Sequence, residues 1–149
     1  MNTKTLKGIT AAVSLLMGLG TATSALATST GGRTLGNGEH QIDVFSFECP
    51  ADFPIGQARV SDREEINNAA AKMQVVLGQI GRPNEQVTDP DGDGGDRSVF
   101  ATVPSGPGQY IAVFKKTGKG VEDYIGDFVC RDANNGLFNA PPKSLHIDQ

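Results

Sequence analysis

Residues 98–114, SVFATVPSGPGQYIAVF, decide the fold class of this chain. The run over 98–103 alternates, with valine and alanine facing one way and phenylalanine and threonine the other. Residues 110–114 alternate again, and alternation with period two is typical of a strand with one buried face. Between the two runs, residues 105–108 have the glycine and proline composition of a tight turn. This stretch therefore predicts two strands joined by a turn.

Similar runs lie on both sides of it. Residues 41–49 alternate, with aromatic side chains on one face, and residues 124–130 form the last clear strand. Residues 56–61 are a second, weaker strand candidate, and KKTGKG over 115–120 is typical of a hairpin tip. Short strands separated by turns at regular spacing are typical of β-sandwiches. We therefore predict an all-β protein with a single β-sandwich of jelly-roll or immunoglobulin-like form.

Residues 61–80 fit two different structures. Ser61 and Glu64 have the spacing of a capping box, which favours a helix and at least a short one near 61–70. Alternatively, residues 71–77 alternate as a strand. The residues at helical spacing in this segment are Ile66, Ala69, Ala70, Met73, Val76, Leu77 and Ile80. The local pattern alone favours the helix, with the strand as the alternative.

The first 27 residues have the features of a bacterial secretory signal. Lys4 and Lys7 precede an apolar run that is too short to span a bilayer, and Ala25-Leu26-Ala27 is a small-x-small cleavage pattern. We therefore expect a signal peptide over 1–27, a flexible segment over 28–38 and the β-sandwich domain over 39–149. The expected location is periplasmic or secreted, with no membrane span left after cleavage.

Charge narrows the classes of partner. The chain has 13 basic and 17 acidic residues, a formal net charge of −4. Removal of Lys4 and Lys7 with the signal peptide leaves 11 basic residues against 17, a net charge of −6. An acidic chain repels polyanions, so nucleic acid and anionic lipid are disfavoured. We expect an extracytoplasmic protein or a polysaccharide as the partner.

The chain has two cysteines, Cys49 and Cys130, separated by 81 residues. In an oxidising compartment an even count predicts one disulfide. A loop of this length has a chain-entropy contribution of roughly 4–5 kcal/mol. There is no C-x-x-C spacing that would indicate a metal or redox pair.

The stretch from Met73 to Cys130 resembles the bacterial pre-peptidase C-terminal domain family. The matching pieces, in order, are QVVL, DPDGDGGD, VFATV, GPGQYIAVFKK and DYIGDFVC, of which the turn over 106–110 is the most specific. The resemblance implies a jelly-roll-like sandwich and favours a strand over 71–77. Family members are usually appendages of secreted proteases, and some bind calcium, matrix or polysaccharide. No protease domain is attached here, so that role does not carry over.

The acidic stretch DPDGDGGD is the sharpest candidate site. Its four carboxylates follow at i, i+2, i+4 and i+7, with glycines between them, and Ca²⁺ prefers six to eight oxygen ligands on a flexible loop. The stretch is not an EF-hand, because Phe100 stands where a bidentate glutamate is needed. Asp-Gly pairs also simply form tight turns. The candidate calcium ligands are Asp89, Asp91, Asp93 and Asp96.

No catalytic motif is visible in the sequence, and we predict that the protein is not an enzyme. His40 and His146 both lie near the ends of the mature chain, and no nucleophile or metalloprotease pattern occurs. Lys115, Lys116 and Lys119 predict a basic hairpin tip, which more often keeps a hairpin soluble than binds a ligand. The two tyrosines, Tyr110 and Tyr124, favour core or corner positions over a binding surface.

Three functions follow from these observations, in decreasing order of support. The first is a secreted or periplasmic, non-enzymatic binding or accessory domain, stabilised by calcium if the acidic loop holds an ion. The second is a secreted inhibitor or regulator of a hydrolase that acts through an exposed loop, either 89–96 or 115–120. The third is a small secreted enzyme, which would require His40 or His146 to meet a nucleophile or a metal.

Overall fold

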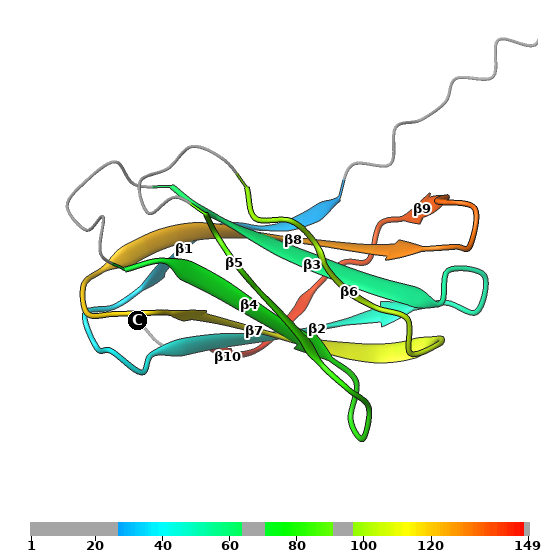
Figure 1. Cartoon of the computed structure of the whole chain (residues 1–149), viewed down its shortest axis with the longest axis horizontal. Coiled ribbons are helices and arrows are strands. Elements are labelled where there is room, and N and C mark those ends of the chain that lie inside the picture. Colours follow the sequence, from blue (N-terminus) through cyan, green and yellow to red (C-terminus); the bar gives the residue numbers. More distant parts are fainter. Residues whose placement is uncertain (1–26, 64–70, 91–96, 148–149) are drawn as a thin grey trace, which may run out of the picture.

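The computed structural model describes residues 27–63, 71–90 and 97–147 of the chain. These residues form ten strands in two stacked layers, and they contain no helix (Figure 1). The strands are β1 (Thr28–Leu35), β2 (Ile42–Cys49), β3 (Ile55–Asp62), β4 (Met73–Gly78), β5 (Glu85–Thr88), β6 (Ala101–Val103), β7 (Gly108–Lys116), β8 (Glu122–Arg131), β9 (Leu137–Phe138) and β10 (Lys143–Ile147).

The two layers are antiparallel sheets. Sheet A has the order β1-β8-β3-β6, with β9 pairing the end of β8, and sheet B has the order β10-β2-β7-β4-β5. Neighbouring strands along the chain often belong to different sheets: β2 lies in sheet B, β3 in sheet A and β4 in sheet B again. The prediction of a single all-β sandwich is confirmed.

Aromatic side chains from both sheets fill the space between the layers. Phe45 of β2 meets Phe114 of β7 edge to face, with ring centroids 5.7 Å apart, and Phe128 of β8 reaches both from sheet A. Phe47 stacks on Tyr110 at 5.4 Å. All five rings are buried, as the alternation in β2, β7 and β8 requires when one face of each strand is covered.

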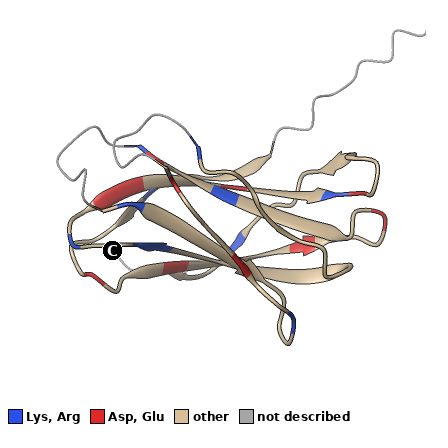
Figure 2. Cartoon of the chain, in the orientation of Figure 1, with Lys and Arg blue, Asp and Glu red and all other residues tan. Residues whose placement is uncertain are grey.

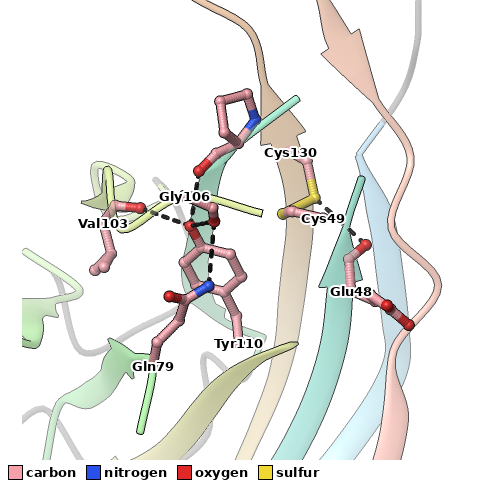
Figure 3. Close-up of a disulfide and its surroundings, with 8 residues drawn as sticks. Glu48, Cys49, Gln79, Val103, Gly106, Tyr110 and Cys130 are labelled. Atoms are coloured by element: carbon pink, nitrogen blue, oxygen red, sulfur yellow. Dashed lines mark hydrogen bonds between the residues drawn. A yellow bond between two sulfur atoms is a disulfide. The ribbon is translucent and has the colours of Figure 1, made fainter. Parts of the chain in front are cut away.

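The predicted disulfide joins the two sheets at one end of the sandwich. Cys49 ends β2 of sheet B and Cys130 lies in β8 of sheet A, with a Cα–Cα distance of 5.5 Å (Figure 3). Both cysteines are buried, and the described residues include no free cysteine. We call this the disulfide end. The opposite end, where β2, β4 and β8 begin and β3 and β7 finish, is called the charged end below.

The ambiguous segment 61–80 is a strand where the structure describes it. Ser61 and Asp62 finish β3, so a helix does not begin there, and residues 64–70 lie outside the described part. β4 then pairs with β7 on one side and β5 on the other, and every second side chain from Met73 to Leu77 is buried. The helical prediction is wrong for β4 because pairing with β7 and β5, which local pattern cannot show, favours the extended form.

The structure contains strands in a segment expected to be flexible and in the tail beyond the last predicted strand. Residues 28–38 were predicted to be a flexible segment, but Thr28–Leu35 form β1 along β8. The tail from residue 132 contains β9 and β10, and β10 pairs with β2. Both β1 and β10 are edge strands with few buried side chains, so their sequences lack the alternation that marks a strand. The described residues contain no helix long and apolar enough to cross a membrane.

Candidate functional site

The acidic loop begins at Asp89, which hydrogen bonds hold in place at the charged end. Asp89 follows β5 and its side chain is fully buried. Its Oδ2 atom accepts a hydrogen bond of 2.9 Å from the backbone N–H of Asp62, and its own N–H donates to the carbonyl of Met73 at 2.8 Å. Asp62 ends a strand of sheet A and Met73 begins a strand of sheet B. Asp89 therefore ties the two sheets together where the loop leaves them.

Neighbouring backbone is held at the same place. The Lys72 ammonium donates to the carbonyl of Pro90, and the Lys72 N–H donates to Thr117 Oγ1 at 2.8 Å. Asp62 is also buried, with 2% of its surface exposed. Two buried carboxylates, Asp62 and Asp89, thus lie at the root of the loop, and carboxylate oxygens are the donors that Ca²⁺ prefers. This donor chemistry fits the predicted ion.

The remaining predicted ligands, Asp91, Asp93 and Asp96, lie outside the described residues. Within residues 27–63, 71–90 and 97–147, no three His, Cys, Asp or Glu side chains come together as a metal site. The calcium site therefore stays a prediction, to which the structure adds the burial of Asp89 and a neighbouring buried residue, Asp62. Asp62 had no sequence signal, because it reaches Asp89 only through the pairing of the two sheets.

A third buried carboxylate, that of Asp43, lies at the charged end between the layers. The Tyr124 hydroxyl donates to Asp43 Oδ2 at 2.5 Å, and neither residue is exposed. Burial raises the pKa of the Tyr124 hydroxyl, the hydrogen bond and charge of Asp43 raise it further, and Arg33 opposes them. The predicted core position of Tyr124 is confirmed. Its partner was missed, because it lies 81 residues away in the sequence.

Tyr110 is the corner residue of the disulfide end. Its hydroxyl lies 2.8 Å from the carbonyl oxygens of Pro54 and Gly106 and 3.1 Å from that of Val103, so it joins the β2–β3 connection to the end of β6 and the β6–β7 turn (Figure 3). Gly56 packs against the ring so closely that an added Cβ would lie 2.5 Å from it. Burial raises the pKa of this hydroxyl. The predicted core or corner role is confirmed.

The predicted basic tip is wrong for Lys116. Its side chain faces the inside of sheet B opposite Met73, and only 5% of it is exposed. The ammonium donates to the carbonyls of Gly36 and Gly120. Burial lowers the pKa of Lys116, and the charge of Glu122 opposes that effect. Of the three lysines, only Lys119 is exposed on the turn, and Lys115 lies on the outward face of β7.

The histidines are both solvent-exposed and belong to different parts of the fold. His40 lies in the connection between β1 and β2, and His146 lies on the edge strand β10, opposite Val44. The expectation of a non-enzymatic protein stays a prediction.

The outer faces of the two sheets differ in chemistry. On sheet A, Asp127 is held by Arg59 and Arg97 at 2.9 Å each, and Arg59 lies over the ring of Phe100. Figure 2 shows the charged residues along the strands. The outer face of sheet B instead has five apolar, half-buried side chains at its centre: Ile42, Val44, Val76, Ile111 and Val113. We call this set the β-branched face.

Comparisons with known proteins add no assignment. No family model matches the chain, and no curated protein or solved structure is significantly similar to it. The resemblance to the pre-peptidase C-terminal domain therefore stays a prediction about residues 73–130.

Proposed function

We propose that this protein is an extracytoplasmic, non-enzymatic binding or accessory domain whose fold is stabilised by one disulfide and by a calcium ion at the acidic loop. Export is supported by the signal pattern over 1–27 and by the pairing of Cys49 with Cys130, since such bonds persist in oxidising compartments. The burial and the hydrogen bonds of the acidic residues give the remaining support.

The observation that carries the calcium proposal is the burial of Asp89. A fully buried carboxylate is costly unless it is paired with a charge, hydrogen bonds or a metal. Asp89 accepts a hydrogen bond from the backbone N–H of Asp62, and the side chain of Asp62 is itself a buried carboxylate. A divalent cation held by this root and by the aspartates that follow in the loop would compensate the negative charge that is buried there.

A binding role is favoured over catalysis because the other buried or ion-paired acids serve the fold. Asp43 accepts from Tyr124, and Asp127 pairs with two arginines on sheet A. Asp132 accepts two backbone N–H groups in the turn before β9, from Asn134 at 2.8 Å and from Gly136 at 2.6 Å. Each of these carboxylates thus holds a piece of backbone or a neighbouring strand.

Thermal unfolding with and without calcium tests the proposal. At a calcium concentration ten times Kd, the free energy of unfolding should rise by about 1.4 kcal/mol, which shifts the Tm of the mature chain by about 5 °C. Magnesium should give a smaller shift, because it resists replacing its water ligands. An unchanged Tm at millimolar calcium would refute the ion.

Three variants separate an ion ligand from a structural residue. Asp93→Asn should abolish the calcium-induced shift, while Asp52→Asn, an exposed aspartate in the β2–β3 turn, should keep it. Asp89→Asn should lower Tm even in a chelator, because Asp89 also holds Asp62. If Asp93→Asn and Asp52→Asn respond to calcium alike, the acidic loop is not the site.

The structure also supports inhibition or regulation of a hydrolase, through a different loop from those expected. The β4–β5 turn projects beyond the rest of the sandwich (Figure 1), and at its tip Ile80 is 90% exposed. The turn is tight, because the Arg82 N–H donates to the Gln79 carbonyl and Gly81 has a φ of 76°. The Gln79 amide also donates to the Gly106 carbonyl at 3.2 Å. A braced turn with an exposed apolar tip is suited to enter a partner's pocket.

A panel of secreted proteases and polysaccharide hydrolases tests this second candidate. Inhibition of one enzyme should weaken at least about tenfold in Ile80→Asp, which removes the apolar tip. Val121→Asp is the matched control, since Val121 is half-exposed on the β7–β8 turn at the charged end. Equal inhibition by both variants would exclude the β4–β5 turn as the contact.

A further inference from the structure

The β-branched face is continuous across three strands. Val44 of β2 lies opposite Val113 of β7, and Val113 lies opposite Val76 of β4, so three valines form one row on the outside of sheet B. Ile111 lies in the next row toward the disulfide end, and Ile42 lies in the next row toward the charged end. The described strands form only the two sheets, so no third sheet covers this face.

At the disulfide end two separate hollows, each with a wall, adjoin the β-branched face, and we call the face and the two hollows together the trough. Along the β4 edge, the projecting turn with Ile80 and Arg82 borders a hollow of about 280 Å³, whose floor includes Val76, Ile111 and Val113. Along the β2 edge, the chain between β9 and β10 forms the other wall. That wall borders a hollow of about 460 Å³, lined by Ser46, Phe47, Glu48, Pro50, Gln109, Phe138, Pro141 and Lys143.

The border of the trough is mainly basic on a chain that is acidic overall. Lys115 lies beside Ile42, Lys143 lies opposite Ser46, and Arg82 lies on the projecting turn. Glu48 is the acidic residue among the lining and border residues just described. The whole chain has a net charge of −4, so this surface is opposite in sign to the average. Such a border attracts an acidic partner and repels a second copy of itself.

The outer faces of sheets A and B differ in how far their residues are buried, and this difference indicates which face a partner can reach. On sheet A, Asp127 and Val129 face outward but are almost fully buried, because Phe100 and the two paired arginines lie over that region. On sheet B, the five side chains of the β-branched face are only half-buried. An apolar centre with a charged border is the usual composition of a binding interface.

We propose that the trough on sheet B binds an extended segment of a partner protein in which apolar residues alternate with acidic ones. The apolar side chains pack on the β-branched face, and the acidic ones meet Lys115, Lys143 and Arg82. A polypeptide fits this surface because the floor is made of aliphatic side chains that suit apolar residues of a partner, and Phe138 in the second hollow adds a further apolar contact. This inference rests on the proposed binding function and names its partner.

Selection from a random linear-peptide display library tests the inference. The folded mature protein is the bait, and the recovered peptides are measured by fluorescence polarisation. We expect peptides in which acidic and apolar residues alternate, with Kd values that weaken severalfold from low to high salt. Val113→Lys should weaken their binding at least about tenfold, and Arg82→Glu with Lys143→Glu should do the same.

Matched controls make the result specific to this face. Ile125→Lys places the same charge on the outward face of β8 in sheet A, opposite Gly32 and Ser61, and should change Kd less than about twofold. Val113→Thr keeps the shape of the side chain, so it tests the apolar contact if Val113→Lys fails to fold. We expect it to weaken binding severalfold.

Four results would overturn the inference. Peptides that bind Val113→Lys and Ile125→Lys equally well would move the site off this face while leaving the binding function in place. Recovery of binding peptides that contain no acidic residues would show that the basic border does not select the partner. A dimer of the wild type in sedimentation that Val113→Lys abolishes would make a second copy the occupant. Recovery of no peptide at all would overturn both the inference and the proposed binding function, whatever the calcium measurements show.

Discussion

Replacing Tyr124 by phenylalanine removes one hydrogen bond from the most buried ionisable pair in the fold. The hydroxyl lies 2.5 Å from Asp43 Oδ2, and both residues are fully buried between the sheets. A hydrogen bond to a charged group contributes about 1.5–3 kcal/mol, and loss of the donor leaves a buried carboxylate less well satisfied. We expect Tyr124→Phe to lower the free energy of unfolding by about 2–3 kcal/mol at pH 7, and Tm by about 8–12 °C.

Guanidinium denaturation followed by far-UV circular dichroism measures this loss. Tyr110→Phe is the matched control, because Tyr110 is equally buried and stacks on an aromatic ring but its hydroxyl meets only neutral carbonyls. Neutral hydrogen bonds contribute about 1 kcal/mol, so this variant should lose less than half as much as Tyr124→Phe. A loss below about 0.5 kcal/mol in Tyr124→Phe would refute the structural importance of the pair.

The same pair predicts how stability changes at high pH. The folded-state pKa of Tyr124 is raised above its ordinary value of 10.0, mainly by burial and then by Asp43. Above pH 10 the unfolded chain releases this proton while the folded chain keeps it, so the unfolded state binds fewer protons and stability falls with rising pH. The contribution of this group is complete below pH 10 and is lost as pH rises toward the folded-state pKa.

The difference between wild type and Tyr124→Phe should therefore shrink by about 1 kcal/mol between pH 10 and pH 11. Taking the difference cancels the lysines and arginines that also titrate in this range. A difference that stays constant from pH 7 to pH 11 would show that the hydroxyl does not hold its proton more tightly in the folded state.

Two further substitutions test other parts of the fold. Replacing both Cys49 and Cys130 by alanine should lower the free energy of unfolding by roughly 4 kcal/mol, because a loop of 81 residues is no longer closed in the unfolded state. Reduction of the wild type should give a similar loss in urea denaturation. A loss below about 1 kcal/mol would contradict this reasoning. Lys116→Met should lower the free energy of unfolding by about 1–3 kcal/mol, since the carbonyls of Gly36 and Gly120 lose their buried hydrogen-bond donor. The control Lys119→Met should change it by less than about 0.5 kcal/mol. Equal thermal shifts for the two variants would contradict the buried position of Lys116.

The strands that could be predicted are those with one fully covered face. β2 and β7 expose every second residue to the core, so burial imposes alternation on the sequence and the alternation can be read back. β1 has a single buried residue, Leu35, and β10 has none, so nothing in their side chains marks them as strands. They extend because the backbone of β8 and β2 offers a free edge, which is a property of the assembled sheet.

The buried charges could not be predicted for a related reason. Lys116 follows the exposed pattern of a hairpin lysine, and only the carbonyls of Gly36 and Gly120 explain why it turns inward. Asp43 lies at an inward position of β2, where a polar residue interrupts the alternation that marks a strand. Its hydrogen-bond partner, Tyr124, belongs to the other sheet. In each case the deciding contact joins segments whose proximity exists only after the two sheets pack.

The positions of these charges divide the sandwich into two ends that are stabilised differently. Asp62, Asp89 and Glu122 are buried at the charged end with Asp43 and Lys116, while Cys49 and Cys130 close the other end. The covalent bond keeps the sheets together at the disulfide end, where the trough and the projecting turn also lie. At the charged end the sheets are held by hydrogen bonds and paired charges, which respond to pH and to cations. A calcium ion at the root of the acidic loop would therefore act where the sandwich has no covalent link, and it would steady the fold without altering the surface proposed for binding.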